Sequence, residues 1–191
     1  MLELRLNQEN KADYHSFPKS YFIRDHGYRV ANLSFALACE LALDKGLCGE
    51  IYIAGLFHDV GKNRLNIDIL EKSGKLTEQE MKYIRKHIYY GAVEAYRRKF
   101  SENIIKFIFF HHENYDGTGY YMGLKGEEIP IGSRILRICD VYDALMSERS
   151  YKKAYTKEEA LKIMAEERNI FDPEIFSVFL KNVDRMVFLS G

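Results

Sequence analysis

Two strongly apolar segments of this chain each run directly into a pair of ionisable residues. They are Ile51–Phe57, followed by His58 and Asp59, and Ile104–Phe110, followed by His111 and His112. An apolar run of this kind predicts a buried helix, which carries the pair at its end into the interior. A buried carboxylate is costly without a partner, and imidazole with carboxylate is a ligand set suited to Zn, Fe or Mn. The competing interpretation is an ordinary helix end with an internal hydrogen bond.

The residues after His58 and Asp59 predict how the first of these helices ends. Gly61 is the residue type that closes a helix with a positive φ angle, so we expect that conformation there. Lys62 places a positive charge one turn beyond the histidine, where it could hold a phosphate.

Three more polar residues are predicted to lie on or beside buried helix faces. His26 heads an apolar stripe with helical spacing, and Asp140 stands between apolar neighbours. His87 lies beside the apolar face of a helix that we expect from the capping box Thr77–Glu80 to about Lys99. For each of the three, a hydrogen-bonded core residue is the competing interpretation.

Helix signals extend along the chain, whereas no segment predicts a strand. A second capping box at Thr156–Glu159 and the pair Asp172-Pro173 mark further helix starts, and the chain contains only three prolines. We therefore expect an all-α fold, a single compact domain over residues 1–191 with about seven or eight helices. Residues 1–18 are weakly periodic and are expected to form an arm or a short helix.

The composition excludes several classes of protein. Lys and Arg number 28, as do Asp and Glu, and a formal net charge of zero argues against a general binder of nucleic-acid polymers or membrane surfaces. Three cysteines without close pairing give neither a disulfide framework nor a Cys-based zinc motif. We find no signal peptide and no apolar run long enough to cross a bilayer, so we expect a cytoplasmic protein.

Five of the six histidines and two carboxylates share a predicted place at a buried helix end or inner face. They are His26, His58, Asp59, His87, His111, His112 and Asp140. Seven such groups exceed the needs of one tetrahedral zinc site. They suit two metal ions, about 3.5–4 Å apart, that share a bridging carboxylate. Two such ions activate a water molecule and stabilise a phosphoryl transition state, so phosphoester hydrolysis is the matching reaction class.

Five motifs of the chain resemble those of the HD-GYP branch of the HD-domain phosphohydrolases, over about residues 20–180. They are His26-Gly27-Tyr28-Arg29-Val30, His58-Asp59-Val60-Gly61-Lys62, His87-Ile88-Tyr89-Tyr90-Gly91, the segment from His111-His112-Glu113 to Gly119-Tyr120, and the segment from Asp140 to Lys152. The resemblance implies the HD-domain fold and hydrolysis of the second messenger cyclic di-GMP to linear pGpG, and in some members to GMP. Some members act on cyclic GMP-AMP. It also implies two divalent metal ions, Fe or Mn, with Zn, Ni or Mg in some preparations, and a metal-bridging hydroxide as nucleophile.

The resemblance further implies a role for each matching residue. The first metal would be held by His26, His58, Asp59 and Asp140, and the second by the bridging Asp59 with His87, His111 and His112. The substrate-binding residues would be Lys62 on the scissile phosphate, Arg149 and Lys152 on the other phosphate, and Gly119 and Tyr120 beside the nucleotide. Asp59 and Lys62 would be the catalytic residues. Asp116 and Asp143 would orient metal ligands, although a surface carboxylate is the competing interpretation for Asp143. Glu113 receives no role.

The chain departs from the family pattern at two positions. The Gly-Tyr-Pro motif reads Gly119-Tyr120-Tyr121, which restores a backbone N–H in a loop beside the pocket and beside a surface thought to bind partner proteins. Phe22 stands where members with three metals carry a glutamate, so we expect two metals. We expect no attached receiver or sensor domain, and hence regulation through a protein partner, ligand availability or oligomerisation.

Two other functions stay open at this point. One is a catalytically weak or inactive binding module that signals by protein contact, which Tyr121 favours. The other is a phosphohydrolase acting on another nucleotide, such as cyclic GMP-AMP, or on another phosphoester. The intact ligand set argues against the first. The Gly-rich loop after His112, with Arg149 and Lys152, favours a cyclic dinucleotide as the substrate.

Overall fold

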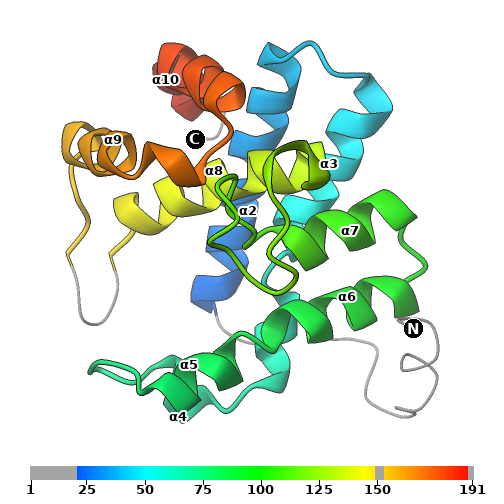
Figure 1. Ribbon diagram of the computed structural model, residues 1–191, viewed down its shortest axis with the longest axis vertical. Coiled ribbons are helices and arrows are strands. Elements are labelled where there is room, and N and C mark those ends of the chain that lie inside the picture. Colours follow the sequence, from blue (N-terminus) through cyan, green and yellow to red (C-terminus); the bar gives the residue numbers. More distant parts are fainter. Residues whose placement is uncertain (1–20, 149–152, 189–191) are drawn as a thin grey trace.

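The computed structural model describes residues 21–148 and 153–188, and this part of the chain is helical without a β-strand (Figure 1). The α-helices are α2 (Tyr21–Glu40), α3 (Lys45–Phe57), α4 (Ile67–Leu70), α5 (Glu78–Ile84), α6 (His87–Arg97), α7 (Glu102–Phe110), α8 (Ile131–Met146), α9 (Lys157–Glu166) and α10 (Pro173–Phe188). The 3-10 helices are η1 (Val60–Arg64), η2 (Gly126–Glu128) and η3 (Arg168–Ile170). Apart from the single turn α4, eight α-helices are present in the described residues, which confirms the expected all-α fold.

Helix α2 lies at the centre of the molecule and packs against α3, α8 and α10 (Figure 1). Helix α7 packs against α3, α6 and α8. Side chains of these helices share one apolar core, in which Leu37, Ile51, Ile108 and Ile135 are fully buried. Helices α4 and α5 lie outside this core at one end of the molecule, as Figure 1 shows. No helix in the described residues is long and apolar enough to cross a membrane.

The helix starts expected from the sequence are confirmed. Both capping boxes form, one between Thr77 and Glu80 and the other between Thr156 and Glu159. Asp172 accepts hydrogen bonds from two backbone N–H groups in the first turn of α10. These side chains satisfy donors that a helix start leaves without intrahelical partners.

The segment from Thr77 to Lys99 forms two helices, so the expectation of one helix is wrong. The chain turns between α5 and α6, where the N–H of Lys86 donates to the carbonyl of Tyr83 at 3.1 Å. This i→i+3 bond tightens the end of α5, as is common at helix termini. The turn places His87 at the first position of α6 rather than in the middle of a long helix.

The expectation of a positive φ angle at Gly61 is also wrong. Gly61 is not among the positive-φ glycines of the described chain and lies inside η1. Its lack of a side chain has another reason, because a Cβ atom there would clash with the carbonyl oxygen of His87 and the backbone nitrogen of Gly91. Gly61 therefore allows η1 to pack directly on the first turn of α6.

We expect Gly61→Ala to destabilise the protein by about 3 kcal/mol or more, because backbone atoms of α6 block the new methyl group. Gly49→Ala is the matched control, since a Cβ atom at Gly49 in α3 would meet no atom within 4 Å. A helical glycine replaced by alanine stabilises by about 1 kcal/mol. Urea unfolding of both variants without metal measures the difference. Equal stability of the two variants would contradict this packing.

Candidate metal centre

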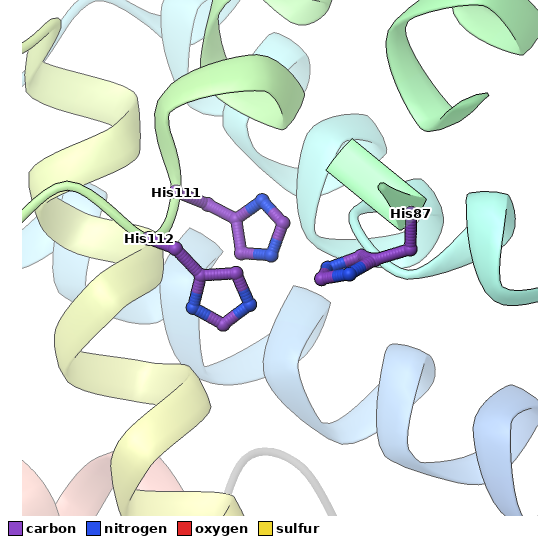
Figure 2. Close-up of side chains that lie close together, drawn as sticks. All are labelled: His87, His111 and His112. Atoms are coloured by element: carbon purple, nitrogen blue, oxygen red, sulfur yellow. The ribbon is translucent and has the colours of Figure 1, made fainter. Parts of the chain in front are cut away.

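Three histidines from neighbouring helix ends meet at one point (Figure 2). His87 begins α6, His111 follows the last residue of α7, and His112 comes next in the chain. The His111 and His112 ring centroids lie 4.1 Å apart, and each lies within 5.6 Å of the His87 centroid. One ring nitrogen from each histidine lies within 4.8 Å of the others. Figure 2 shows the rings of His111 and His112 directed toward His87.

A second group of potential metal ligands adjoins the first. His26 of α2, His58 at the end of α3 and Asp140 of α8 place one ligand atom each within 4.8 Å of one another. The set His58, Asp59 and His111 meets the same distance, so the two groups are contiguous. The structure thus brings together all seven residues that the sequence singles out, from segments far apart in the chain.

Asp59 lies between the two groups. Its Oδ1 atom is 3.5 Å from Nε2 of His87, whereas its Oδ2 atom is 3.5 Å from Nε2 of His58 and 3.8 Å from Nε2 of His26. One carboxylate oxygen therefore faces each group. A carboxylate placed in this way can serve two cations at once.

Three of the imidazoles are oriented by the same local hydrogen bond. The Nδ1 atoms of His58, His87 and His111 lie 2.7, 2.8 and 2.7 Å from the carbonyl oxygen three residues earlier in the chain. A carbonyl only accepts, so Nδ1 carries the proton and Nε2 of the neutral ring carries a lone pair. A histidine ligand is held in the same way in known metal sites, with its second nitrogen on a carbonyl or carboxylate.

The atoms that face the centre lack partners. Nε2 of His58, His87 and His111 and Oδ1 of Asp59 are buried and accept no hydrogen bond from the described residues. A buried polar atom left in this state costs roughly 1–3 kcal/mol. Acceptors of this kind in both ligand groups fit divalent cations, which would satisfy them.

The protonation states of the histidines suit a cation. Burial lowers the pKa of His87 to about 4 and that of His111 to about 3. The pKa of His112 is also held well below its usual value, by burial first and then by the neighbouring histidines. All three rings are therefore neutral at pH 7. Neutral imidazole is the form that binds a metal.

The two carboxylates of the cluster are ionised. Burial opposes the charge of Asp59, but Lys62 and the neighbouring histidines outweigh it and hold the pKa well below its usual value. Burial also opposes the charge of Asp140, where the hydrogen bond from His26 is the largest opposing contribution and the pKa again falls. Both carboxylates are therefore available as anionic ligands beside the neutral rings of His87, His111 and His112.

His26 is held by residues of α8. Its Nδ1 atom lies 2.6 Å from Oδ2 of Asp143, and its Nε2 atom lies 3.1 Å from Oδ1 of Asp140. Burial works to lower the pKa of His26, but these two hydrogen bonds outweigh it and raise the pKa to about 9. Arg29 donates through Nε at 2.6 Å and through Nη2 at 3.0 Å to the Asp143 carboxylate. Asp143 is therefore a buried carboxylate that orients His26, and the surface interpretation is wrong.

Lys62 and Tyr120 lie beside the cluster, as the sequence predicts. Nζ of Lys62 donates to Oδ2 of Asp59 at 2.5 Å, and about a quarter of the lysine side chain is exposed. The Tyr120 ring stacks on His112, with 4.9 Å between the centroids and 23° between the planes. Gly119 is explained by packing of the loop on itself, because a Cβ atom there would clash with the backbone of residues 112–114.

Asp116, which was expected to orient a metal ligand, is hydrogen-bonded within its own loop instead. The Asp116 carboxylate accepts from the N–H and the hydroxyl of Thr118 in the same loop. No hydrogen bond within the described residues joins Asp116 to one of the seven ligand candidates. Arg149, Lys152 and the side chain of Phe22 lie outside the part that the structure describes.

Glu113 has a structural role that sequence reasoning missed. The residue is buried, and its Oε1 atom accepts from the N–H groups of Met122 at 2.6 Å and Gly123 at 3.2 Å. It thereby fixes the end of the loop that carries Tyr120 and the half-exposed Tyr121. A carboxylate next to an apolar helix, the pattern that singled out Asp59, could have predicted that Glu113 is buried. The partners of Glu113 are backbone N–H groups, whereas those expected for Asp59 are metal ions.

Comparisons with known proteins identify the family of this chain. The model of a family described as HD domain matches residues 5–175. A cyclic di-GMP phosphodiesterase of Pseudomonas aeruginosa is 42% identical over 159 residues, which cover 83% of this chain and 38% of that protein. A 3'3'-cGAMP-specific phosphodiesterase of Vibrio cholerae is 35% identical over 175 residues, which cover 90% of this chain and 40% of that protein. The chain thus spans less than half the length of these relatives.

Two solved structures share the fold. An HDG"Y"P protein of Bdellovibrio bacteriovorus has a TM-score of 0.70 at 22% identity, covering 96% of this chain and 56% of that one. A cyclic GMP-AMP phosphodiesterase of V. cholerae has a TM-score of 0.65 at 23% identity, covering 85% of this chain and 45% of that one.

We expect Asp143→Asn to weaken metal binding roughly 10–100-fold, because the charge that orients His26 is lost. Competition with a chromophoric chelator for Mn(II) measures the affinity. Asp184→Asn is the matched control, since that carboxylate is exposed on α10. An unchanged affinity in Asp143→Asn would show that the contact with His26 does not support metal binding.

The lowered pKa values of His87 and His111 predict that the metal-free protein is sensitive to acid. The unfolded chain protonates these residues below about pH 6.5, whereas the folded protein keeps them neutral to about pH 4 and 3. Stability present above pH 6.5 is therefore lost as the pH falls through this range. The raised pKa of His26 has the opposite effect, because it stabilises the folded protein at low pH. Most of that stabilisation is already present at pH 6.5, so further acidification adds little to offset the loss. The urea midpoint of chelated protein should be lower at pH 5 than at pH 7, and an equal or higher midpoint would contradict these assignments.

Proposed function

This chain belongs to the HD-domain family, in its HD-GYP branch, and on that premise we propose that it is a metal-dependent phosphodiesterase that hydrolyses a cyclic dinucleotide. Cyclic di-GMP is the first substrate candidate, with linear pGpG and then GMP as products, because the relative at 42% identity is a cyclic di-GMP phosphodiesterase. Cyclic GMP-AMP is the second, because relatives at 35–36% identity are specific for it.

The placement of Asp59 is the observation that carries this proposal. Its Oδ2 atom faces His26 and His58, and its Oδ1 atom faces His87. We assign the first ion to His26, His58 and Asp140 and the second to His87 and the pair His111-His112, with Asp59 shared. Fe or Mn suits a set of imidazoles and carboxylates.

The two ions, when bound, would supply the activated water and the positive charge that phosphoester hydrolysis needs. The residues of the chain position the reacting groups. Lys62 is partly exposed and donates a hydrogen bond to Asp59. It can donate instead to an oxygen of the scissile phosphate. Tyr120, stacked on His112, offers a flat surface beside the same point. Cys139 is no competing nucleophile, because burial raises the pKa of its thiol to about 12.

The proposal also covers points beyond the site. We place residues 1–191 in one domain, with Arg149 and Lys152 on the second phosphate of the substrate. We place the protein in the cytoplasm, where a second messenger would be degraded, and we expect a protein partner to regulate it. Support for such a partner is the exposure of two large apolar residues, Tyr121 at 51% and Met122 at 65%.

Turnover is tested on protein purified without oxygen and loaded with Fe(II) or Mn(II), with cyclic di-GMP and cyclic GMP-AMP offered separately. Metal-dependent loss of one nucleotide would establish the activity and identify the substrate. Two bound metals without turnover would favour the binding module or another phosphoester.

We expect Asp59→Ala to lose turnover and to fall from two metals per chain to fewer than one, because one carboxylate serves both ions. Metal content by mass spectrometry and turnover are measured on the same sample. Asp68→Ala, which removes an exposed carboxylate of α4, is the control. Retention of two metals in Asp59→Ala would exclude the shared role of this carboxylate.

A further inference from the structure

Arg137 stands next to the metal cluster but has no place in the roles assigned so far. It lies on α8 three residues before Asp140, so the two side chains emerge from the same face of the helix. Its Nε atom donates to Oδ1 of Asn114 at 2.9 Å, two residues after His112. The guanidinium group is thereby held beside the end of the cluster that His112 occupies.

Most of the donors of this guanidinium group are unused. An arginine side chain has five N–H groups, and only the one on Nε of Arg137 has an acceptor within residues 21–148 and 153–188. No carboxylate of that part of the chain pairs with Arg137, although the residue is half-buried. A half-buried planar fork of donors without an acidic partner is suited to a ligand that presents two adjacent acceptors.

A second arginine and an aromatic ring complete the surroundings of Arg137. The guanidinium carbon of Arg85, at the end of α5, lies 4.5 Å from the centroid of the Tyr120 ring. The charges of Arg137 and Arg85 both act on the Tyr120 hydroxyl group, lowering its pKa against the larger effect of burial, which raises it. Arg85 thus lies over a ring that stacks on His112, and Arg137 is close enough for its charge to act on the same tyrosine.

The part of a cyclic dinucleotide that has no assigned hydrogen-bonding residue indicates what Arg137 binds. This step rests on the proposed function. The metal cluster and Lys62 account for the scissile phosphate, and Arg149 and Lys152 are assigned to the other phosphate. Tyr120 offers the bases a stacking surface, but no residue has been assigned to their hydrogen-bonding edges. Guanine presents O6 and N7 as two adjacent acceptors, which match two parallel N–H groups of arginine. Adenine presents a donor in place of O6, and flat groups such as Tyr120 and Arg85 stack on either base.

We propose that Arg137 binds the O6 and N7 edge of a guanine base beside the metal cluster, with Tyr120 and Arg85 as the stacking surface. Arg137 is thus a specificity-determining residue that favours guanine over adenine nucleotides. Asn114 has a positioning role, because its carbonyl oxygen fixes the Nε end of the guanidinium and leaves the other donors to the ligand.

The test uses mononucleotides, which contain no bond for a cyclic dinucleotide phosphodiesterase to hydrolyse. Equilibrium dialysis of the metal-loaded protein compares GMP, AMP and 7-deaza-GMP, which lacks only the N7 acceptor. We expect GMP to bind roughly tenfold tighter than either of the others, since only GMP offers both acceptors to the two N–H groups of Arg137. Equal binding of the three nucleotides would overturn the proposal, whether or not any cyclic dinucleotide is turned over.

Substitutions separate base recognition from charge. Arg137→Gln should bind GMP and AMP equally, and Arg137→Lys should not restore the preference, because lysine keeps the charge but lacks the fork. Arg168→Gln, an exposed arginine of η3, is the matched control and should behave like the wild type. An equal loss for GMP and AMP in Arg137→Gln would indicate a phosphate contact, and restoration by lysine would indicate a charge effect. Either result would overturn guanine recognition. If Arg137→Gln does not fold, the comparison of GMP with 7-deaza-GMP on the wild type decides.

Discussion

The buried carboxylate of Asp59 imposes a requirement that the rest of the site meets. An ionised group at this depth needs positive charge close by, and Lys62 is bonded to only one of its oxygens. The other oxygen stands among imidazole nitrogens that are themselves acceptors. Neutral lone pairs cannot satisfy one another, so these atoms need a cation or a donor from outside the described residues. The proposed metal centre follows from this mismatch of acceptors without donors.

The polar residues of the site are placed in the interior by the positions at which the helices begin and end. The apolar side chains of α3 and α7 pack in the core, and a histidine lies at the C-terminal end of each helix. The turn before α6 does the same for a helix start, and Gly61 allows η1 to lie against it. Burial of the apolar segments thus offsets the cost of holding polar atoms in the interior.

Sequence reasoning located most of the cluster because its signals are local. An apolar run ending in His58-Asp59 or His111-His112 can be recognised without tertiary structure, and so can a histidine on a helical stripe such as His26. The turn before His87 was missed because capping and periodicity do not distinguish one long helix from two short ones in line. The reason for Gly61 was missed because its neighbour is backbone about 30 residues away in the sequence. Arg137 and Asn114 were missed for the same reason, since their contact joins a loop to a helix.

The hydrogen bonds that orient the imidazoles differ in range. Those of His58, His87 and His111 close within four residues, so each ring is oriented by the same turn that carries it. The bond of His26 joins residues 117 positions apart and exists only once α2 has packed against α8. The α6–α7 half of the centre therefore draws its oriented rings from two helices that are neighbours in the chain, whereas the other half needs α2 and α8 to be packed together before His26 is held. Damage to the packing of α2 on α8 would thus reach one half of the centre directly, through His26.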